Sequence, residues 1–320
     1  MELSVIVPVY NGEKTLRATL DSLLAQGRLP FEWEVVAVDD GSTDGSLLIL
    51  KEYEEKGKKA GFELRVLSFE NGGVGVCRNR GLAAARGEVI TYLDSDDRLL
   101  PGALGSLMET KKETGASILL FDSHYLYENG KTKPFPASSH GGGWMDVEDY
   151  MLSLPCPWNK LFDRSLFTEG NFRFEEGILY EDLALIPALG AVAKGKIWYE
   201  KKPFHLYFQS EGSIMRSPWS EKKLDIFPAL GALKKNAERE KEAVEYLFWF
   251  HLYRNFDWIF WEAGRLDAIR RGNKLMRKNF PHWQKNPLIR RNASRRERLA
   301  SLLFYYECFP VIGLWKGGKK

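Results

Sequence analysis

Cysteine is scarce in this chain, whose 320 residues include only Cys77, Cys156 and Cys308. The three are widely spaced and form no Cys-x-x-Cys pair. Disulfide-stapled domains carry paired cysteines, and structural zinc sites carry closely spaced ones. The sequence therefore indicates neither a disulfide framework nor a zinc site.

Long apolar runs are also absent. No stretch approaches the roughly 18 to 20 apolar residues that a bilayer-spanning helix needs. The first residues, MELSVIVPVYNGE, lack the basic start and small-residue cleavage site of a signal peptide. With 44% hydrophobic and 28% charged residues, the composition is ordinary for a soluble globular protein of one large domain or two. We therefore expect a cytoplasmic protein.

The net charge of +3 is unevenly distributed. Residues 269–320 hold 14 Lys and Arg and 2 Glu, a net charge of +12, whereas the other residues hold 32 basic and 41 acidic side chains, a net charge of −9. This basic segment predicts an anionic partner surface, for which nucleic acid and anionic lipid both qualify. No recognised nucleic-acid-binding signature accompanies it, so we expect no nucleic acid partner.

Strand-like and helix-like segments alternate through the first 122 residues. Apolar and β-branched residues predict strands at residues 3–10, 33–40, 64–69, 88–94 and 117–122. Apolar residues at helical spacing predict helices from Leu16 up to Gly27, through Leu47, Leu50 and Tyr53, from 74 to 85, and after Pro101. Such alternation is typical of a parallel α/β sheet with helices on both faces.

After Phe121 the pattern changes. Residues 125–135, YLYENGKTKPF, carry an Asn-Gly pair between strand-like runs and predict a hairpin, so antiparallel strands should extend or flank the sheet. Short elements are expected at 147–154, 159–162, 183–193, 197–200 and 204–208. From about Ser220 onward the sequence predicts helices without a repeat, and we place a domain boundary there.

Polar residues gather where the predicted strands end. Pro8, Tyr10, Asn11 and Glu13 follow the first strand, Asp39 and Asp40 end the second, Asn71 to Gly73 follow the third, and Asp94, Ser95, Asp96 and Asp97 end the fourth. Helix caps and turns would explain any one of them. Because ligands bind outside the carboxyl ends of parallel strands, the set together predicts a binding site.

The run YLDSDD, residues 92–97, is the most heavily charged of these ends. Asp94 and Asp96 are two residues apart in extended or turn backbone, so their side chains can point to one side. Two carboxylates with waters and a phosphate suit Mg²⁺ or Mn²⁺, although acids at a helix start are also ordinary.

A second glycine-rich segment follows the third strand. Gly73 and Gly75 give half of a dinucleotide fingerprint, but Arg78 replaces its third glycine, which disfavours a nicotinamide or flavin enzyme. A helix start with Arg78 still suits a nucleotide diphosphate.

Six segments in order, SVIVPVYNGE, VVAVDDGSTD, NGGVGVCRNRGL, YLDSDD, CPWNKLF and ILYEDLAL, resemble glycosyltransferase family 2, nucleotide-sugar-dependent enzymes of the GT-A fold. The resemblance covers about residues 1–215. It implies an α/β fold, a Rossmann-like mixed sheet flanked by helices, in a catalytic domain of residues 1–219. Residues 1–121 would bind the nucleotide-sugar and 122–219 the acceptor, followed by a helical region, 220–320. It also implies an inverting transferase, a donor that is most often a UDP-sugar, and Mn²⁺ or Mg²⁺ as cofactor.

The resemblance also implies roles for individual residues. Donor-binding residues would be Pro8, Tyr10, Glu13, Asp39, Asp40, Asn71, Arg78, Asp94 and Ser95, with Lys160 and Ser213 closing over the diphosphate or acceptor. Asp96 would hold the metal. Glu181 and Asp182 resemble the family's ED motif, with Asp182 as the base. If the family resemblance is set aside, the sequence predicts that Asp182 is a helix N-cap. His205 would then be a structural residue or an extra metal contact.

The chemistry agrees with these roles. An acceptor hydroxyl is a poor nucleophile and needs a carboxylate to take its proton, and the departing diphosphate needs positive charge. The segment 204–215 lacks the arginine often found there, so the resemblance does not extend to the phosphate contacts of that loop. The QxxRW motif and the membrane spans of processive synthases are missing, so we infer one sugar per event. We expect a transferase that acts on a glycan or lipid-linked acceptor of a bacterial-type cell surface; the alternative is a nucleotide-sugar-binding protein without activity.

The last 27 residues, 294–320, predict a helix that begins at a capping box of Ser294 and Glu297. Leu299, Leu302, Leu303 and Tyr306 recur on one face, with basic residues at both ends. Such a helix can lie on an anionic membrane at the inner face of the cell, or pack on the catalytic domain or a second subunit.

Overall fold

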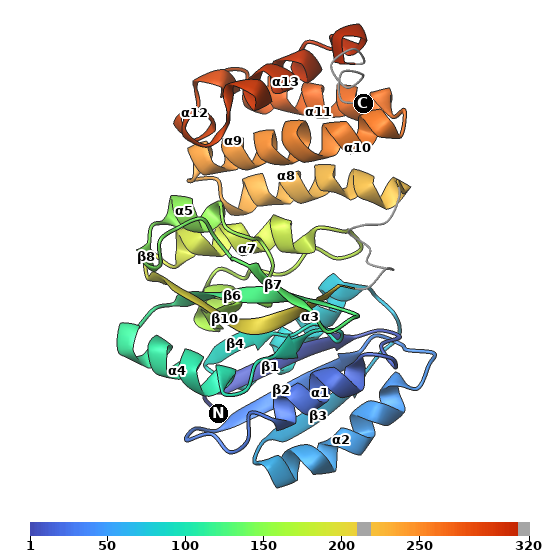
Figure 1. Ribbon diagram of the computed structural model, residues 1–320, viewed down its shortest axis with the longest axis vertical. Coiled ribbons are helices and arrows are strands. Elements are labelled where there is room, and N and C mark those ends of the chain that lie inside the picture. The colour runs from blue at the N-terminus through green and yellow to red at the C-terminus, as the bar shows by residue number, and fades with distance from the viewer. Residues whose placement is uncertain (210–218, 313–320) are drawn as a thin grey trace. The chain divides into compact units, whose positions relative to one another are not determined.

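The computed structural model describes residues 1–209 and 219–312 (Figure 1). The chain divides into two compact units, Met1–Arg216 and Ser217–Lys320. The first is built around one mixed sheet and the second is helical. The predicted mixed α/β fold with a helical C-terminal region is confirmed.

Four parallel strands form one half of the sheet, in the order β3-β2-β1-β4. They are β1 (Leu3–Val9), β2 (Trp33–Asp39), β3 (Glu63–Ser68) and β4 (Val89–Tyr92). The helices α1 (Leu16–Leu24), α2 (Ser46–Ala60), α3 (Val74–Ala84) and α4 (Ala103–Thr114) alternate with them as predicted. The carboxyl ends of β1, β2 and β3 therefore lie side by side, which assembles the polar strand ends at one edge.

Alternating residues of the strands pack against different helices. Val5 and Ala37 belong to the cluster that contains the buried leucines of α1 and α4, whereas Val38 packs against Cys77 of α3. A Cβ atom at Gly81 of α3 would lie 2.4 Å from Cγ2 of Ile6. The missing side chain therefore lets α3 approach the sheet closely.

The other half of the sheet is mixed. β9 (Lys160–Asp163) runs antiparallel to β4 and to β6 (Ile118–Tyr127), and β10 (Ile197–Gln209) runs parallel to β6. The predicted hairpin is confirmed by the antiparallel pairing of β6 with β7 (Thr132–Phe135). Three helices, α5 (Val147–Met151), α6 (Ser165–Glu169) and α7 (Glu181–Val192), complete this half.

Two details of this half differ from the predicted strands. The separate segments at 197–200 and 204–208 form one strand, β10, whose register shifts between Glu200 and His205. Two short strands, β5 (Arg98–Leu99) and β8 (Gly143–Met145), pair with β10 and were not predicted. Strands of two or three residues carry too little alternation to be seen in a sequence.

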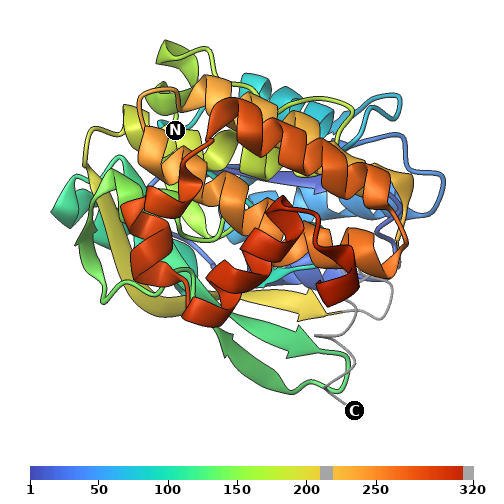
Figure 2. The same ribbon diagram turned by 90° about the horizontal axis from the view of Figure 1, so that it is seen from above.

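The second unit consists of short helices, drawn in orange and red in Figure 2. They are η2 (Glu221–Asp225), α8 (Ile226–Asn236), α9 (Lys241–Trp249), the π-helix η3 (Phe250–Phe256), α10 (Asp257–Glu262), α11 (Leu266–Asn279), η4 (Trp283–Lys285), α12 (Pro287–Asn292) and α13 (Arg295–Tyr305). The capping box predicted at Ser294 and Glu297 is present at the start of α13. Within the described residues, none of the helices is both long and apolar enough to cross a membrane.

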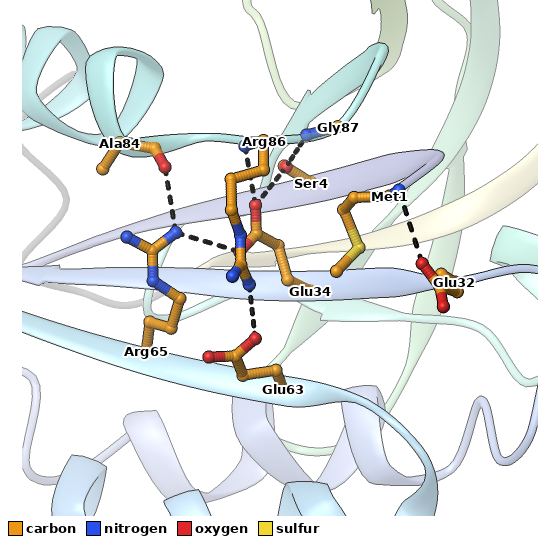
Figure 3. Close-up of polar contacts among 9 residues, drawn as sticks. All are labelled: Met1, Ser4, Glu32, Glu34, Glu63, Arg65, Ala84, Arg86 and Gly87. Atoms are coloured by element: carbon orange, nitrogen blue, oxygen red, sulfur yellow. Dashed lines mark hydrogen bonds and ion pairs between the residues drawn. The ribbon is translucent and has the colours of Figure 1, made fainter.

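A buried charge cluster joins the amino ends of the strands, at the edge of the sheet opposite to the polar strand ends (Figure 3). Glu34 of β2 is fully buried and accepts hydrogen bonds from Ser4 Oγ at 2.8 Å, from Arg65 at 3.0 Å and from Arg86 Nε at 2.9 Å. Burial alone would raise the pKa of Glu34, but the bonds from Arg86, Ser4 and Arg65 outweigh it and hold the pKa below its usual value.

We expect Glu34→Ala to lower the free energy of unfolding by about 3 kcal/mol, the scale for removing one partner of a buried ion pair. Because the pKa of Glu34 is lower in the folded protein, its contribution is present above the unfolded pKa of about 4.3 and is lost as the pH falls through the folded pKa. Denaturant unfolding at several pH values checks this. A matched control is Glu55→Ala, which removes a carboxylate that is 70% exposed. A stability difference that does not shrink at low pH would contradict the prediction.

Candidate active site

The loops that follow β1 and β2 are bound to each other. Asn11 adopts a left-handed conformation (φ 49°), and its Oδ1 accepts a hydrogen bond from the Thr43 amide at 2.8 Å. Glu13 Oε2 accepts one from the Gly45 amide at 3.1 Å, at the start of α2. Glu13, which the sequence predicted to bind the nucleotide-sugar, therefore connects these two loops. Its contact with the nucleotide-sugar stays a prediction.

Two buried carboxylates at the end of β2 organise the neighbouring loops. Asp40 accepts hydrogen bonds from the amides of Gly72 and Gly73 at 2.9 and 2.8 Å, and Asn71 Nδ2 donates to the Asp40 carbonyl at 3.0 Å. Asp39 accepts hydrogen bonds from Ser68 Oγ at 2.8 Å and from the Ser42 amide at 3.2 Å. These residues place the glycine segment at the start of α3.

Exposed apolar side chains lie near this edge. Tyr10 is 53% exposed after β1, and Phe69 is 40% exposed after β3. The Arg80 guanidinium lies 4.3 Å from the centre of the Phe69 ring, a cation–π contact. Exposed rings offer a flat surface on which a nucleotide base can stack. Sequence reasoning identified Tyr10 and missed Phe69 and Arg80, which carry no motif.

Arg78 of α3 joins two parts of the chain that are far apart in sequence. Its guanidinium forms an ion pair with Asp94 at 3.1 Å and another with Glu181, the first residue of α7. Both Arg78 and Glu181 are buried, and the Phe174 ring lies 5.6 Å from the guanidinium. The YLDSDD turn and the ED pair therefore meet at Arg78, as a site for both donor and base requires.

The start of α7 has an unusual backbone. Tyr180 adopts the left-handed conformation (φ 65°) and is the N-cap, so the reading of Asp182 as N-cap is wrong. Asp182 is the second helical residue, and its Oδ1 accepts a hydrogen bond from the Leu183 amide at 2.7 Å. A Cβ atom at Gly75 would lie 2.3 Å from the Glu175 carbonyl oxygen and 3.6 Å from Cγ of Glu181. Gly75 thus allows the segment before α7 to approach α3.

The site has more acidic than basic groups, and its carboxylates hold their protons more tightly than usual. Burial, together with Asp97 and Asp94, raises the pKa of Asp96 to about 7, although its side chain keeps solvent contact. Burial also raises the pKa of Glu181 to about 7 against the lowering effect of Arg78, and raises that of Asp182. Such raised pKa values are common among catalytic groups and cation sites.

Asp97, the last residue of the YLDSDD turn, and His205 of β10 are both fully buried. Asp97 Oδ1 accepts a hydrogen bond from the Phe208 amide at 2.8 Å, which ties the YLDSDD turn to β10. His205 Nε2 lies 3.1 Å from Asp97 Oδ2, and its ring stacks on Trp158 at 4.5 Å. Burial lowers the pKa of His205 to about 3, so the imidazole is neutral.

The remaining predicted residues have structural contacts. Pro8 is buried within β1, and the Ser95 carbonyl accepts hydrogen bonds from the hydroxyls of Thr15 and Thr19. Lys160 Nζ donates to the carbonyls of Leu154 and Cys156 and to Asn159 Oδ1, at 2.7 to 2.8 Å, and burial lowers its pKa to about 8. All three N–H groups of the Lys160 ammonium are therefore used to hold the loop before β9. Ser213 lies outside the described residues.

No cluster of three or more His, Cys, Asp or Glu side chains within residues 1–209 and 219–312 is arranged to hold a metal ion by itself. Mg²⁺ and Mn²⁺ at phosphate sites commonly use one or two carboxylates, with phosphate oxygens and water as the other ligands. Asp96, a solvent-accessible carboxylate among like charges, fits that kind of site.

Residues 4–170 match the profile of a family described as "Glycosyl transferase family 2". The match spans more than half of the chain and contains the strand ends, Arg78 and the YLDSDD turn. The chain therefore belongs to glycosyl transferase family 2.

Relatives and solved structures are similar over different lengths. The chain is 33% identical over 174 residues to the poly(ribitol-phosphate) beta-glucosyltransferase of Bacillus spizizenii, covering 54% of this chain and 27% of that one. It is 31% identical over 234 residues to glycosyltransferase GlyA of Streptococcus pneumoniae, covering 69% and 32%. The chain thus spans about a third or less of the length of these curated relatives.

The crystal structure of S. aureus TarS residues 1–349 in complex with UDP-GlcNAc is similar in fold. Its TM-score is 0.74 at 22% sequence identity, with 95% of this chain and 89% of that chain covered.

We expect Arg78→Met to destabilise the protein by about 3 kcal/mol, because it leaves buried carboxylates without their cation. The raised pKa values of Glu181 and Asp182 should rise further. Since carboxylates with a raised folded pKa destabilise the folded state as they ionise, the loss of stability should be larger at pH 8 than at pH 5. Denaturant unfolding at the two pH values measures it, with Arg80→Met on the same helix as control. An equal loss at both pH values would show that Arg78 acts by packing alone.

Proposed function

We propose that this glycosyltransferase moves one sugar, with inversion, from a UDP-sugar to a hydroxyl group of a glycan or lipid-linked acceptor in cell-surface polysaccharide synthesis. The observation that carries the proposal is the ion pairing of Arg78 with both Asp94 and Glu181, which sets a candidate base beside the donor turn. Similar proteins support the chemistry: one relative is a poly(ribitol-phosphate) beta-glucosyltransferase, and the similar TarS structure is a complex with UDP-GlcNAc.

The donor would bind at the edge formed by the loops after β1 to β4. In this proposal the base of the nucleotide stacks near Tyr10 and Phe69, and Asp94 contacts the ribose. The bonds of Asp39 and Asp40 to the loops keep this edge in place before the donor arrives. In the proposed division, residues 1–121 hold the donor and residues 122–219 hold the acceptor.

Asp182 is the proposed base. Glu181 is committed to Arg78, whereas Asp182 uses only Oδ1, for the Leu183 amide, among the described residues. Its raised pKa suits a group that must accept a proton as the new glycosidic bond forms. The carboxylate would take the proton of the acceptor hydroxyl while the bond between the sugar and the diphosphate breaks.

Asp96 would hold the metal, Mn²⁺ or Mg²⁺, together with the donor diphosphate. The bound ion would supply positive charge to the departing diphosphate. Arg78 is neutralised by two carboxylates, and the three N–H donors of Lys160 are used inside the chain, so neither of these two cations is free to neutralise the diphosphate. We further propose that the enzyme works in the cytoplasm at the inner face of the membrane, attached through residues 294–320.

Asp182→Asn keeps the shape of the side chain and removes the base. We expect transfer to fall by about 10²- to 10⁴-fold, the usual scale for the loss of a general base, while the Kd for UDP changes little. Single-turnover transfer and calorimetric UDP titration measure the two effects. Unchanged transfer would point to Glu181, or to the alternative of a nucleotide-sugar-binding protein if the wild type is also inactive. An equal loss of UDP affinity would make Asp182 structural.

Asp96→Asn should weaken UDP binding in the presence of Mn²⁺ and abolish most transfer, because one charged metal ligand is lost. In EDTA the wild type and the variant should bind UDP with similar, weak affinity. Titrations with and without Mn²⁺ test this, with Asp44→Asn in the loop after β2 as a carboxylate control. Normal turnover of the variant in EDTA would show that Asp96 does not bind a metal that the reaction needs.

A further inference from the structure

A pocket of about 290 Å³ lies in the second unit, between the start of α13 and η4. Its lining is partly cationic and partly apolar: Trp283, Gln284, Arg295, Arg298, Leu299 and Leu302. A cavity of this composition suits a ligand that has an anionic group beside an apolar one.

The polar groups of this pocket lack partners. Neither guanidinium, of Arg295 or of Arg298, forms an ion pair or hydrogen bond with any residue of 1–209 or 219–312. By contrast, Glu297, which lies between the two arginines in sequence, is occupied by Arg254 at 3.0 Å and by the Ser294 amide at 2.8 Å. The pocket therefore presents two guanidinium groups without partners among the described residues and no available carboxylate from the first turn of α13.

Exposed apolar side chains occur in the pocket and further along the chain. Leu299 is 51% exposed, Tyr306 63% and Val311 48%, which makes three of the eight exposed large hydrophobic residues in the described part of the chain. Within the second unit the helix packs through Phe304 and Tyr305, which are buried. The face that the sequence predicted to be apolar therefore points away from this unit's own core.

We infer that the pocket binds the headgroup phosphate of an anionic phospholipid in a bilayer. The two guanidinium groups would hold the phosphate, since arginine matches phosphate oxygens in a bidentate way. Leu299 and Leu302 would contact the first methylenes of the acyl chains. Residues 269–320 carry a net charge of +12, which complements an anionic leaflet. The inference deepens the proposed membrane-face function and rests on it.

The test is flotation of the full-length protein with vesicles of phosphatidylglycerol and phosphatidylcholine, compared with vesicles of phosphatidylcholine alone. The double variant Arg295→Gln, Arg298→Gln should bind the anionic vesicles about 30-fold more weakly, from about 1 kcal/mol for each basic residue at an anionic surface. The matched control, Lys274→Gln with Lys278→Gln, removes the same charge from exposed positions of α11 and should lose much less.

Three outcomes would overturn the inference. The first is a wild type that ignores anionic vesicles at low salt. The second is an equal loss in the two double variants, which would mean diffuse attraction without a pocket. The third is a wild type that is stabilised by glycerol phosphate or inorganic phosphate and ignores vesicles, which would mean a soluble anion as ligand.

UDP-sugar hydrolysis on the same samples separates the two proposals. Hydrolysis without vesicle binding would contradict the lipid inference and the membrane attachment but leave the proposed sugar transfer intact. Vesicle binding without any hydrolysis or UDP affinity would contradict the proposed sugar transfer alone. Because the side chains of Arg295 and Arg298 have no partners among the described residues, their replacement should leave the thermal unfolding midpoint unchanged.

Discussion

The ion pairs of Arg78 hold together the two halves of the candidate active site. The Asp94 turn ends a parallel strand, and Glu181 starts a helix in the second half of the sheet domain, 103 residues from Arg78. A buried arginine is stable only with such partners, and buried carboxylates need the arginine equally. Each therefore constrains the other, so the position of the candidate base is coupled to the turn that carries the candidate metal ligand.

Several other polar residues of the site act first as supports. Asp39 and Asp40 bind neighbouring loops, Asp97 fixes β10 to the turn, and Lys160 closes the loop before β9. A polar residue at a strand end can thus be required for activity without touching the substrate. Loss of activity in a variant of Asp40 or Lys160 would say little about chemistry unless stability is measured with it.

The sequence predicted the longer strands, the hairpin and the capping box because these depend on local patterns of a few residues. The same holds for the grouping of Asp40 and Asp94 at one edge, which follows from parallel strands. The pairing of Arg78 with Glu181 left no local pattern, because it depends on how two distant segments pack. Likewise, nothing around Lys160 showed that all its donors would be used inside the chain, and Phe69 lay in no motif. Secondary structure was therefore predictable from the sequence, whereas the contacts between side chains of distant segments were not.

Gly75 shows how a missing atom can shape catalysis. Its α-carbon faces the Glu175 carbonyl so closely that no methyl group fits between them. Even alanine there would act as a wedge between α3 and the segment that leads into α7. The displaced part would include the ED pair, while Asp40 contacts the chain before α3, at the amides of Gly72 and Gly73. A single methyl group could therefore separate donor binding from sugar transfer without altering any charged residue.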